Sequence, residues 1–207
     1  TDVDNDALTY QILVSLNPDV SSPLTNETGI SNTYYIQPSE LDFATYYWRV
    51  RANDSDNYGT WSDIWNFTLV PSVSIKLTQN SINFGTMAQF EVNDTTNNQP
   101  APFKLENDGN TEANVSVNSS SLWVSASAQL NTSYYQFKAD NSEANSFNWL
   151  NSQTTWANMS DISKSIINTL NHTDSNDLAE IDIRVEVASD EPPLSKSASL
   201  IFEAGES

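Results

Sequence analysis

The sequence predicts an all-β fold made of two tandem β-sandwiches, with one short helix near residues 160–170. Apolar residues recur at every second position in short runs, and clusters of Pro, Asn, Asp, Ser and Gly separate the runs. This pattern is typical of antiparallel strands joined by turns. The 207 residues match the length of two sandwiches of about 100 residues each. The aromatic share of 11% supplies the apolar bulk that disordered chains lack.

The first domain is predicted over residues 1–71. In its third apolar run, Tyr46, Trp48 and Val50 fall on one face of a strand, while Arg49 and Arg51 fall on the other. We therefore expect a strand with one buried and one solvated face. The predicted strands of this domain cover residues 8–16, 33–36, 46–52 and 64–70.

A family resemblance accompanies this pattern. Leu41 precedes Tyr46 by five residues, and an alternating strand, an acidic loop and the run Ser62-x-x-Trp65-x-Phe67-Thr follow. This order resembles the E, F and G strands of fibronectin type III-like domains, with Tyr46 at the tyrosine-corner position. Residues 2–10 look like the loop between strands B and C and the start of strand C. Residues 1–71 thus resemble a partial fibronectin type III-like domain, without counterparts of strands A and B.

The absence of these two strands has a physical consequence. A sandwich without them exposes a sheet edge and an apolar face, which folded proteins avoid as free surfaces. Two explanations stay open at the level of sequence. Either the sequence begins inside the domain, or a strand from a neighbouring subunit completes the sandwich by donor-strand complementation.

The second domain is predicted over residues 72–207, because Pro71 ends one run and a new alternating run begins at Ser72. Asn107-Asp108-Gly109-Asn110 predicts a turn between two strands. Residues 160–170 are predicted to be a helix, because an apolar stripe recurs there at helical spacing after a possible N-cap. The cap is Ser160, and the stripe consists of Ile162, Ile166, Ile167 and Leu170. Final strands are predicted over residues 179–188 and 196–204.

A second resemblance lies in this domain. Phe84-Gly85 and the run Phe103-x-Leu105-x-Asn-Asp-Gly-Asn110 are similar to segments of archaeal cell-surface proteins, and distantly similar to the TasA/camelysin group of biofilm fibre subunits. The resemblance implies an Ig-like or jelly-roll sandwich in an extracellular assembly.

Composition excludes several classes of partner. With 27 acidic and 8 basic residues, the net charge is −19, and this charge repels phosphate backbones and anionic lipids. We therefore expect no nucleic-acid partner. The sequence has no cysteine and no apolar run of 18 residues, so we expect neither disulfides nor membrane insertion. These features suit a secreted prokaryotic protein.

The sequence gives no indication of an enzyme. His172 is the sole histidine, and no recognised motif surrounds a nucleophile with a base. The best ionic candidate is a calcium site, because two acidic loops would meet at one pole of a fibronectin-like sandwich and Ca²⁺ prefers six to eight oxygen ligands. Its candidate ligands are Asp2, Asp4, Asp6, Asp54 and Asp56. Solvated turns are the plainer interpretation of the same residues.

Glycans are possible at Asn-x-Ser/Thr sequons. The candidate sites are Asn26, Asn53, Asn66, Asn93, Asn114, Asn118, Asn131, Asn158 and Asn171. Surface aromatics that stack on sugars would instead favour an adhesin or carbohydrate-binding module. Those considered are Tyr34, Tyr35, Tyr47, Trp61, Tyr134, Tyr135, Trp149 and Trp156.

The sequence as a whole favours a structural subunit or segment of an extracellular prokaryotic filament or surface layer of archaeal type. Its expected partners are copies of itself or neighbouring domains, which it would contact through β-strands and sheet edges. The alternative is an adhesin or a carbohydrate-binding accessory module of a large secreted surface protein.

Overall fold

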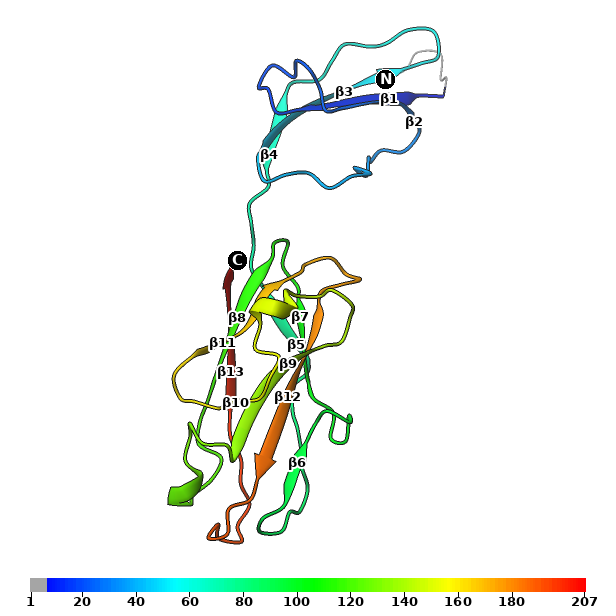
Figure 1. Ribbon diagram of the computed structural model, residues 1–207. Helices are drawn as coiled ribbons and strands as arrows, with labels where there is room; N and C mark the ends of the chain where they lie inside the picture. Colours follow the sequence, from blue (N-terminus) through cyan, green and yellow to red (C-terminus); the bar gives the residue numbers. More distant parts are fainter. Residues whose placement is uncertain (1–6) are drawn as a thin grey trace. The chain divides into compact units, whose positions relative to one another are not determined.

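The computed structural model describes residues 7–207 and divides the chain into two compact units, the first ending at Pro71 and the second beginning at Ser72 (Figure 1). The predicted all-β class is confirmed, since strands and loops make up the described chain apart from two single 3₁₀ turns, Ala126–Ala128 and Trp149–Asn151. No helix within residues 7–207 is long and apolar enough to cross a membrane.

Unit 1 is one antiparallel sheet of four strands in the order β2-β1-β3-β4. Alternation places Ile12 opposite Val50 and Val14 opposite Trp48, so the apolar residues of β1 and β3 share one face. The strands are β1 (Thr9–Ser15), β2 (Thr25–Ile30), β3 (Thr45–Asn53) and β4 (Trp65–Thr68).

Two predictions for unit 1 are corrected. The strand expected over residues 33–36 is an extended segment outside the sheet, because no neighbouring strand pairs with it in the described chain. A strand that was not predicted, β2, takes the edge beside β1 instead. Its sequence, Thr-Asn-Glu-Thr-Gly-Ile, is mostly exposed and lacks an alternating apolar pattern.

The two faces of β3 differ in chemistry but not in burial: apart from Tyr46, which is buried, every residue of the strand is half-buried, so the expected pair of one buried and one solvated face is not found. On the polar face, the Arg51 guanidinium carbon lies 3.8 Å from the ring centre of Tyr58 and 4.4 Å from that of Trp61. On the apolar side, Tyr46 is 2% exposed, and its hydroxyl donates to the Asp42 carbonyl at 2.9 Å. A bond from a Tyr hydroxyl to the backbone a few residues upstream also occurs in tyrosine corners; the resemblance to fibronectin type III-like domains stays a prediction.

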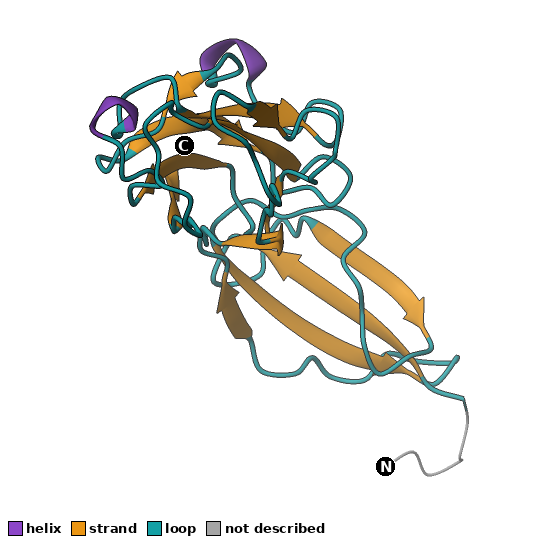
Figure 2. Ribbon diagram, turned by 90° about the horizontal axis from the view of Figure 1, so that it is seen from below, coloured by secondary structure: helices purple, strands orange, loops and turns teal. Residues whose placement is uncertain are grey.

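Unit 2 is a sandwich of two antiparallel sheets (Figure 2). The larger sheet has the order β10-β9-β12-β7-β5, with β6 also paired to β12, and the smaller sheet has the order β11-β8-β13. The larger sheet contains β5 (Ile75–Gln79), β6 (Val92–Asp94), β7 (Phe103–Asn107), β9 (Tyr135–Asn141), β10 (Ala157–Asn158) and β12 (Leu178–Glu186). The smaller contains β8 (Ala113–Ser119), β11 (Lys164–Leu170) and β13 (Leu200–Glu206).

The core lies between these sheets. Leu105, Val115 and Ile181 are at most 1% exposed, and Phe103 meets Phe202 across the sandwich edge to face, with ring centres 5.7 Å apart. The predicted turn at residues 107–110 carries the chain from β7 in one sheet to β8 in the other. It is therefore a corner between the two layers.

The predicted helix is wrong, because Lys164–Leu170 forms strand β11. The pairing of β11 with β8 shifts register between Ser165 and Ile167 and again between Ile167 and Leu170. At such bulges, consecutive residues can face the same side. Ile166, Ile167 and Leu170 are all fully buried, so the bulged strand reproduces a spacing that resembles a helical stripe.

Candidate functional site

The apolar face of the unit 1 sheet lines a groove of about 780 Å³. No layer of strands covers this face in the described chain. Trp65 and Phe67 on β4 are 48% and 38% exposed. None of the side chains that line the groove is charged. We call the following six side chains the open face: Ile12, Val14, Trp48, Val50, Trp65 and Phe67.

We call residues 33–37 the crossing segment, and all of them except Ile36 line the same groove. Figure 1 shows the chain between β2 and β3 running along one side of the sheet. Tyr34 and Ile36 in this segment are 64% and 75% exposed. The segment is tethered at one end, where the Thr25 hydroxyl donates to Gln37 Oε1 at 3.0 Å. Within residues 7–207, no strand pairs with its backbone.

This arrangement has the chemistry needed to accept a β-strand. In the described part of the chain, the backbone N–H and C=O groups of the crossing segment have no strand partner, and the open face offers apolar surface beside them. Strand addition uses both features, since main-chain hydrogen bonds supply affinity and alternate side chains enter apolar pockets. Each Å² of apolar surface covered would contribute about 25 cal/mol.

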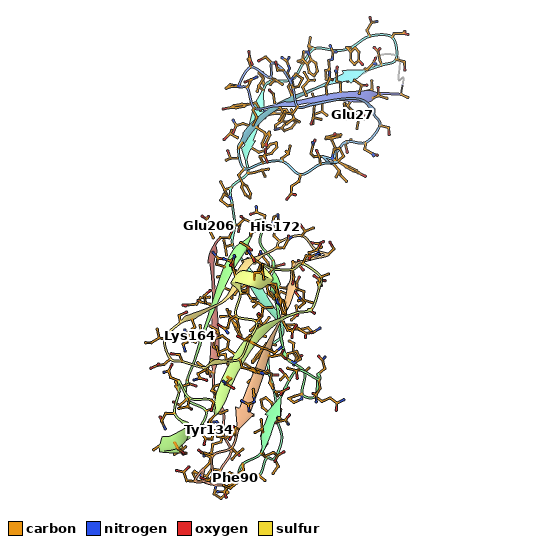
Figure 3. The ribbon with its side chains drawn as sticks, in the orientation of Figure 1. Glu27, Phe90, Tyr134, Lys164, His172 and Glu206 are labelled. Carbon is orange, nitrogen blue, oxygen red and sulfur yellow. The ribbon has the colours of Figure 1, made fainter. Side chains whose placement is uncertain are left out.

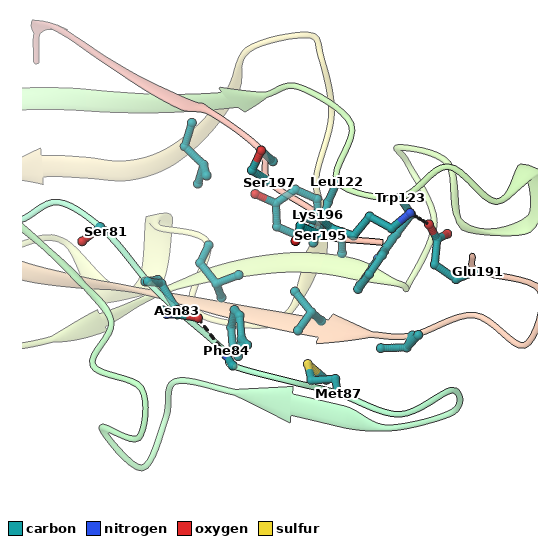
Figure 4. Close-up of a pocket in the computed structure, with 18 of the residues that line it drawn as sticks. Ser81, Asn83, Phe84, Met87, Leu122, Trp123, Glu191, Ser195, Lys196 and Ser197 are labelled. Atoms are coloured by element: carbon teal, nitrogen blue, oxygen red, sulfur yellow. Dashed lines mark hydrogen bonds and ion pairs between the residues drawn. The ribbon is translucent and has the colours of Figure 1, made fainter. Parts of the chain in front are cut away.

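Unit 2 has a second groove, of about 1090 Å³, which we call the side groove (Figure 4). It lies between residues 80–89 on one side and residues 194–202 on the other. Phe84 and Met87 line the first side, Phe202 lines the second, and Trp123 is 8% exposed at the groove. Sequence reasoning missed this groove, although the half-buried alternation of Ile82 and Phe84 could have indicated an extended segment at its wall.

Glu191 fixes one end of the side groove. It is 4% exposed, and its carboxylate accepts from Lys196 Nζ at 2.5 Å and from the Ser125 N–H at 2.9 Å. The Val124 N–H donates to it as well. Burial tends to raise the pKa of Glu191, but the hydrogen bonds from Lys196, Ser125 and Val124 outweigh burial and lower its pKa overall. Glu191 thus joins the loop before β13 to the loop after β8.

Only part of the predicted calcium site lies in the described chain, because Asp2, Asp4 and Asp6 fall outside residues 7–207. Asp54 Oδ1 accepts from the N–H groups of Asp56 and Asn57 at 3.1 and 2.7 Å, which lowers the Asp54 pKa. Among the described residues, no group of three or more His, Cys, Asp or Glu could hold a metal ion. The calcium site stays a prediction.

The nine sequon asparagines are all exposed or half-exposed. In some of the sequons, the Asn side-chain amide or the Thr hydroxyl already makes a hydrogen bond. Asn114 Nδ2 donates to the Glu206 carbonyl at 3.3 Å, and Asn158 Nδ2 donates to the Asn131 carbonyl at 3.0 Å. The Thr95 hydroxyl, in the sequon of Asn93, is buried and donates to Asp182. Glycosylation stays a prediction at all nine positions.

Most of the candidate aromatic side chains are buried or half-buried. Tyr34 and Trp149 are exposed, whereas Tyr135 is buried and its desolvation raises its pKa to about 12. Trp61 lies against Arg51, and Trp156 lies 5.6 Å from Lys138 Nζ. The side chains therefore do not form one sugar-stacking platform. His172 lies in the loop after β11 and is half-buried. In Figure 3, His172 lies near one end of unit 2 and Phe90 near the opposite end.

Comparison with known proteins identifies no family: no family model matches the chain, and no curated protein matches it. Among solved structures, an α-L-rhamnosidase from Streptomyces avermitilis complexed with L-rhamnose is similar at 16% identity, over 94% of this chain and 19% of that chain, with a TM-score of 0.26. An α-L-rhamnosidase from Dictyoglumus thermophilum is similar at 14% identity, over 97% of this chain and 24% of that chain, with a TM-score of 0.27. The chain thus spans about a quarter or less of these two. Likenesses this weak carry no argument about its fold or activity.

Proposed function

We propose that the chain is a structural subunit or segment of an extracellular prokaryotic surface assembly, a filament or a surface layer of archaeal type, in which strands and sheet edges join neighbouring copies. The observation that carries the proposal is the open face of unit 1, beside the crossing segment, with which no strand pairs within residues 7–207. Its role is mechanical, and it requires no catalytic group.

Protein surfaces of this kind are rarely left free. An apolar sheet face without a second layer is a site for association, and an unpaired strand edge is a template for pairing with another chain. The groove is free of charged side chains although the whole chain has a net charge of −19. Copies that repel one another in general can therefore make contact where charge is absent.

The composition supports an extracellular place for such a contact. The chain has no cysteine, carries an acidic surface that is solvated readily, and presents nine sequon asparagines that all reach the surface. The carbohydrate-binding alternative has less support, since Tyr34 and Trp149 are the exposed members of the aromatic set and belong to different units.

The test is assembly of the full chain. Light scattering and electron microscopy over a range of concentrations should show polymers or sheets, and Trp65→Ser, which removes a large exposed ring from the open face, should reduce assembly about tenfold or more. Ile162→Ser is the matched control, because Ile162 is 73% exposed and lies outside both grooves. A wild-type chain that is folded and monomeric at every concentration would contradict the proposal.

A further inference from the structure

We propose that the side groove of unit 2 is a separate binding site for an extended peptide strand, with apolar side chains at alternate positions and no acidic side chains. The site does not depend on the open face of unit 1. It is supported by two walls whose edges have no strand partner in the described chain, by an apolar floor and by the charge of the surrounding unit.

The first wall is the free edge of β13. In the described chain, β13 pairs with β8 alone. The Ser120 N–H donates to the Ser199 carbonyl at 3.1 Å, so Ser199 directs its backbone groups toward β8. Backbone direction alternates along a strand. Leu200, Phe202 and Ala204 consequently direct their N–H and C=O groups away from β8.

The second wall is the segment Ser81–Gly85. Its side chains alternate, with Ile82 and Phe84 half-buried and Ser81 and Asn83 exposed, as in a strand at the margin of a sandwich. Its backbone has no strand partner within residues 7–207, and the Gly85 N–H bonds to Asn83 Oδ1 at 2.8 Å. The Ser81 carbonyl accepts from Gln79 Nε2 at 2.7 Å. In the described chain, the side groove therefore lies between two backbones that have no strand partner on the groove side, β13 and the residues between Ser81 and Gly85.

The floor of the groove sets the side-chain pattern of the occupant. Ile183, Val185 and Val187 come from β12, and Leu200 and Phe202 flank them. A strand lying between the two walls would direct every second side chain onto this floor and the others to solvent. Apolar residues are thus required at alternate positions. Five residues along Ser81–Gly85 correspond to about 17 Å of strand.

Charge excludes acidic strands. Residues 72–207 carry 17 acidic side chains against six basic ones, so a strand with carboxylates would be repelled as it approaches. Glu191 and Lys196, at the end of the groove, neutralise each other. The strand that occupies the side groove should therefore have neutral or basic residues at the positions that face solvent.

The probe is a fluorescent peptide that copies residues 72–79, Ser-Val-Ser-Ile-Lys-Leu-Thr-Gln, because it alternates correctly and its only charged side chain is a lysine. The control peptide, Ser-Val-Ile-Leu-Ser-Lys-Thr-Gln, has the same composition without the alternation. Fluorescence anisotropy with the full chain should show saturable binding of the first peptide, and binding of the control at least tenfold weaker. Equal binding of the two, or no saturation by the first, would overturn the inference.

Three variants of the full chain locate the site. Met87→Lys places a charge in the side groove and should weaken binding tenfold or more, while Ile162→Lys and Trp65→Ser should leave binding unchanged. Loss of binding in Trp65→Ser with retention in Met87→Lys would place the peptide on the open face, which overturns this inference and leaves the proposed function intact.

An amide NMR titration of the unmodified chain covers the case in which Met87→Lys unfolds. Peptide binding should shift the amide resonances of Phe84, Leu200, Phe202 and Ala204. Shifts that spare these four residues would count against the side groove, whatever the variants do.

Discussion

Glu191 is the residue on which the end of the unit 2 sandwich most depends. Its carboxylate is buried and accepts from one ammonium and two backbone N–H groups. Glu191→Gln keeps the shape but removes the charge-assisted bonds and leaves Lys196 without its counter-charge. We expect a loss of about 1–3 kcal/mol in the free energy of unfolding, measured by urea denaturation. The exposed Glu112→Gln is the control, and an equal effect of both changes would contradict this role.

The same carboxylate makes unit 2 sensitive to acid. Its pKa is lower in the folded state than the ordinary value of 4.5, so it contributes stability above pH 4.5 that is lost as pH falls through the folded pKa. Thermal melts from pH 6 to pH 3 should therefore show a smaller loss of Tm for Glu191→Gln than for the wild type. If Tm falls equally with pH in the wild type and in Glu191→Gln, Glu191 does not cause the sensitivity of unit 2 to acid.

Asp177 has the opposite effect. Burial, followed by the nearby charges of Glu143 and Glu106, raises its pKa above the ordinary 3.8, so its ionised form weakens the fold at neutral pH and protonation relieves the cost. Asp177→Asn should raise Tm at pH 7 by about 2–4 °C, the shift that roughly 1 kcal/mol gives in a domain of this size. The exposed Asp161→Asn should change Tm little. A fall in Tm for Asp177→Asn would show that the ionised carboxylate stabilises the fold and would contradict this prediction.

Among the structural elements, β11 shows the limit of prediction from apolar spacing, because a helix was predicted where this strand lies. Strand β11 buries Ile166 and Ile167 completely, while Ile162 lies before the strand and is 73% exposed. Ile166→Ala and Ile167→Ala should each cost about 2–5 kcal/mol, while Ile162→Ala should stay within about 0.5 kcal/mol. Urea denaturation of the three variants is the measurement. A comparable cost at Ile162 would favour the helical stripe instead.

Alternation in the sequence predicted β1, β3, β4 and β12, because apolar and polar residues alternate along much of each strand and leave a period of two. Burial follows that period most clearly in β12 and not at all in β4, whose four residues are all exposed. Alternation could not predict β2, whose residues are almost all exposed. Nor could it show that residues 33–37 find no partner, since pairing depends on strands far away in sequence. The side groove escaped prediction for the same reason: residues 80–89 and 194–202 meet only in the folded sandwich.

For the whole molecule, the two units should differ in stability. Unit 2 has a closed core between two sheets, while the described part of unit 1 is a single sheet with an open face. A single sheet with an uncovered apolar face removes less apolar surface from water than a closed core does, so unit 1 gains less stability from burial. Differential scanning calorimetry should therefore show two transitions, with unit 1 unfolding at the lower temperature. Trp65→Ser should affect the lower transition alone.

Assembly should then couple to that lower transition. A partner that binds only the folded form stabilises it by mass action, so the unit 1 transition should rise with protein concentration while the unit 2 transition is unchanged. The net charge of −19 opposes contact between copies. Salt at 0.15 M screens charges that are more than about 8 Å apart, so added NaCl should make the unit 1 transition temperature depend more strongly on protein concentration. Scans at several protein concentrations in 20 mM and 150 mM NaCl make the comparison. If the temperature of the unit 1 transition depends on neither protein concentration nor NaCl concentration, copies of this chain do not cover its open face.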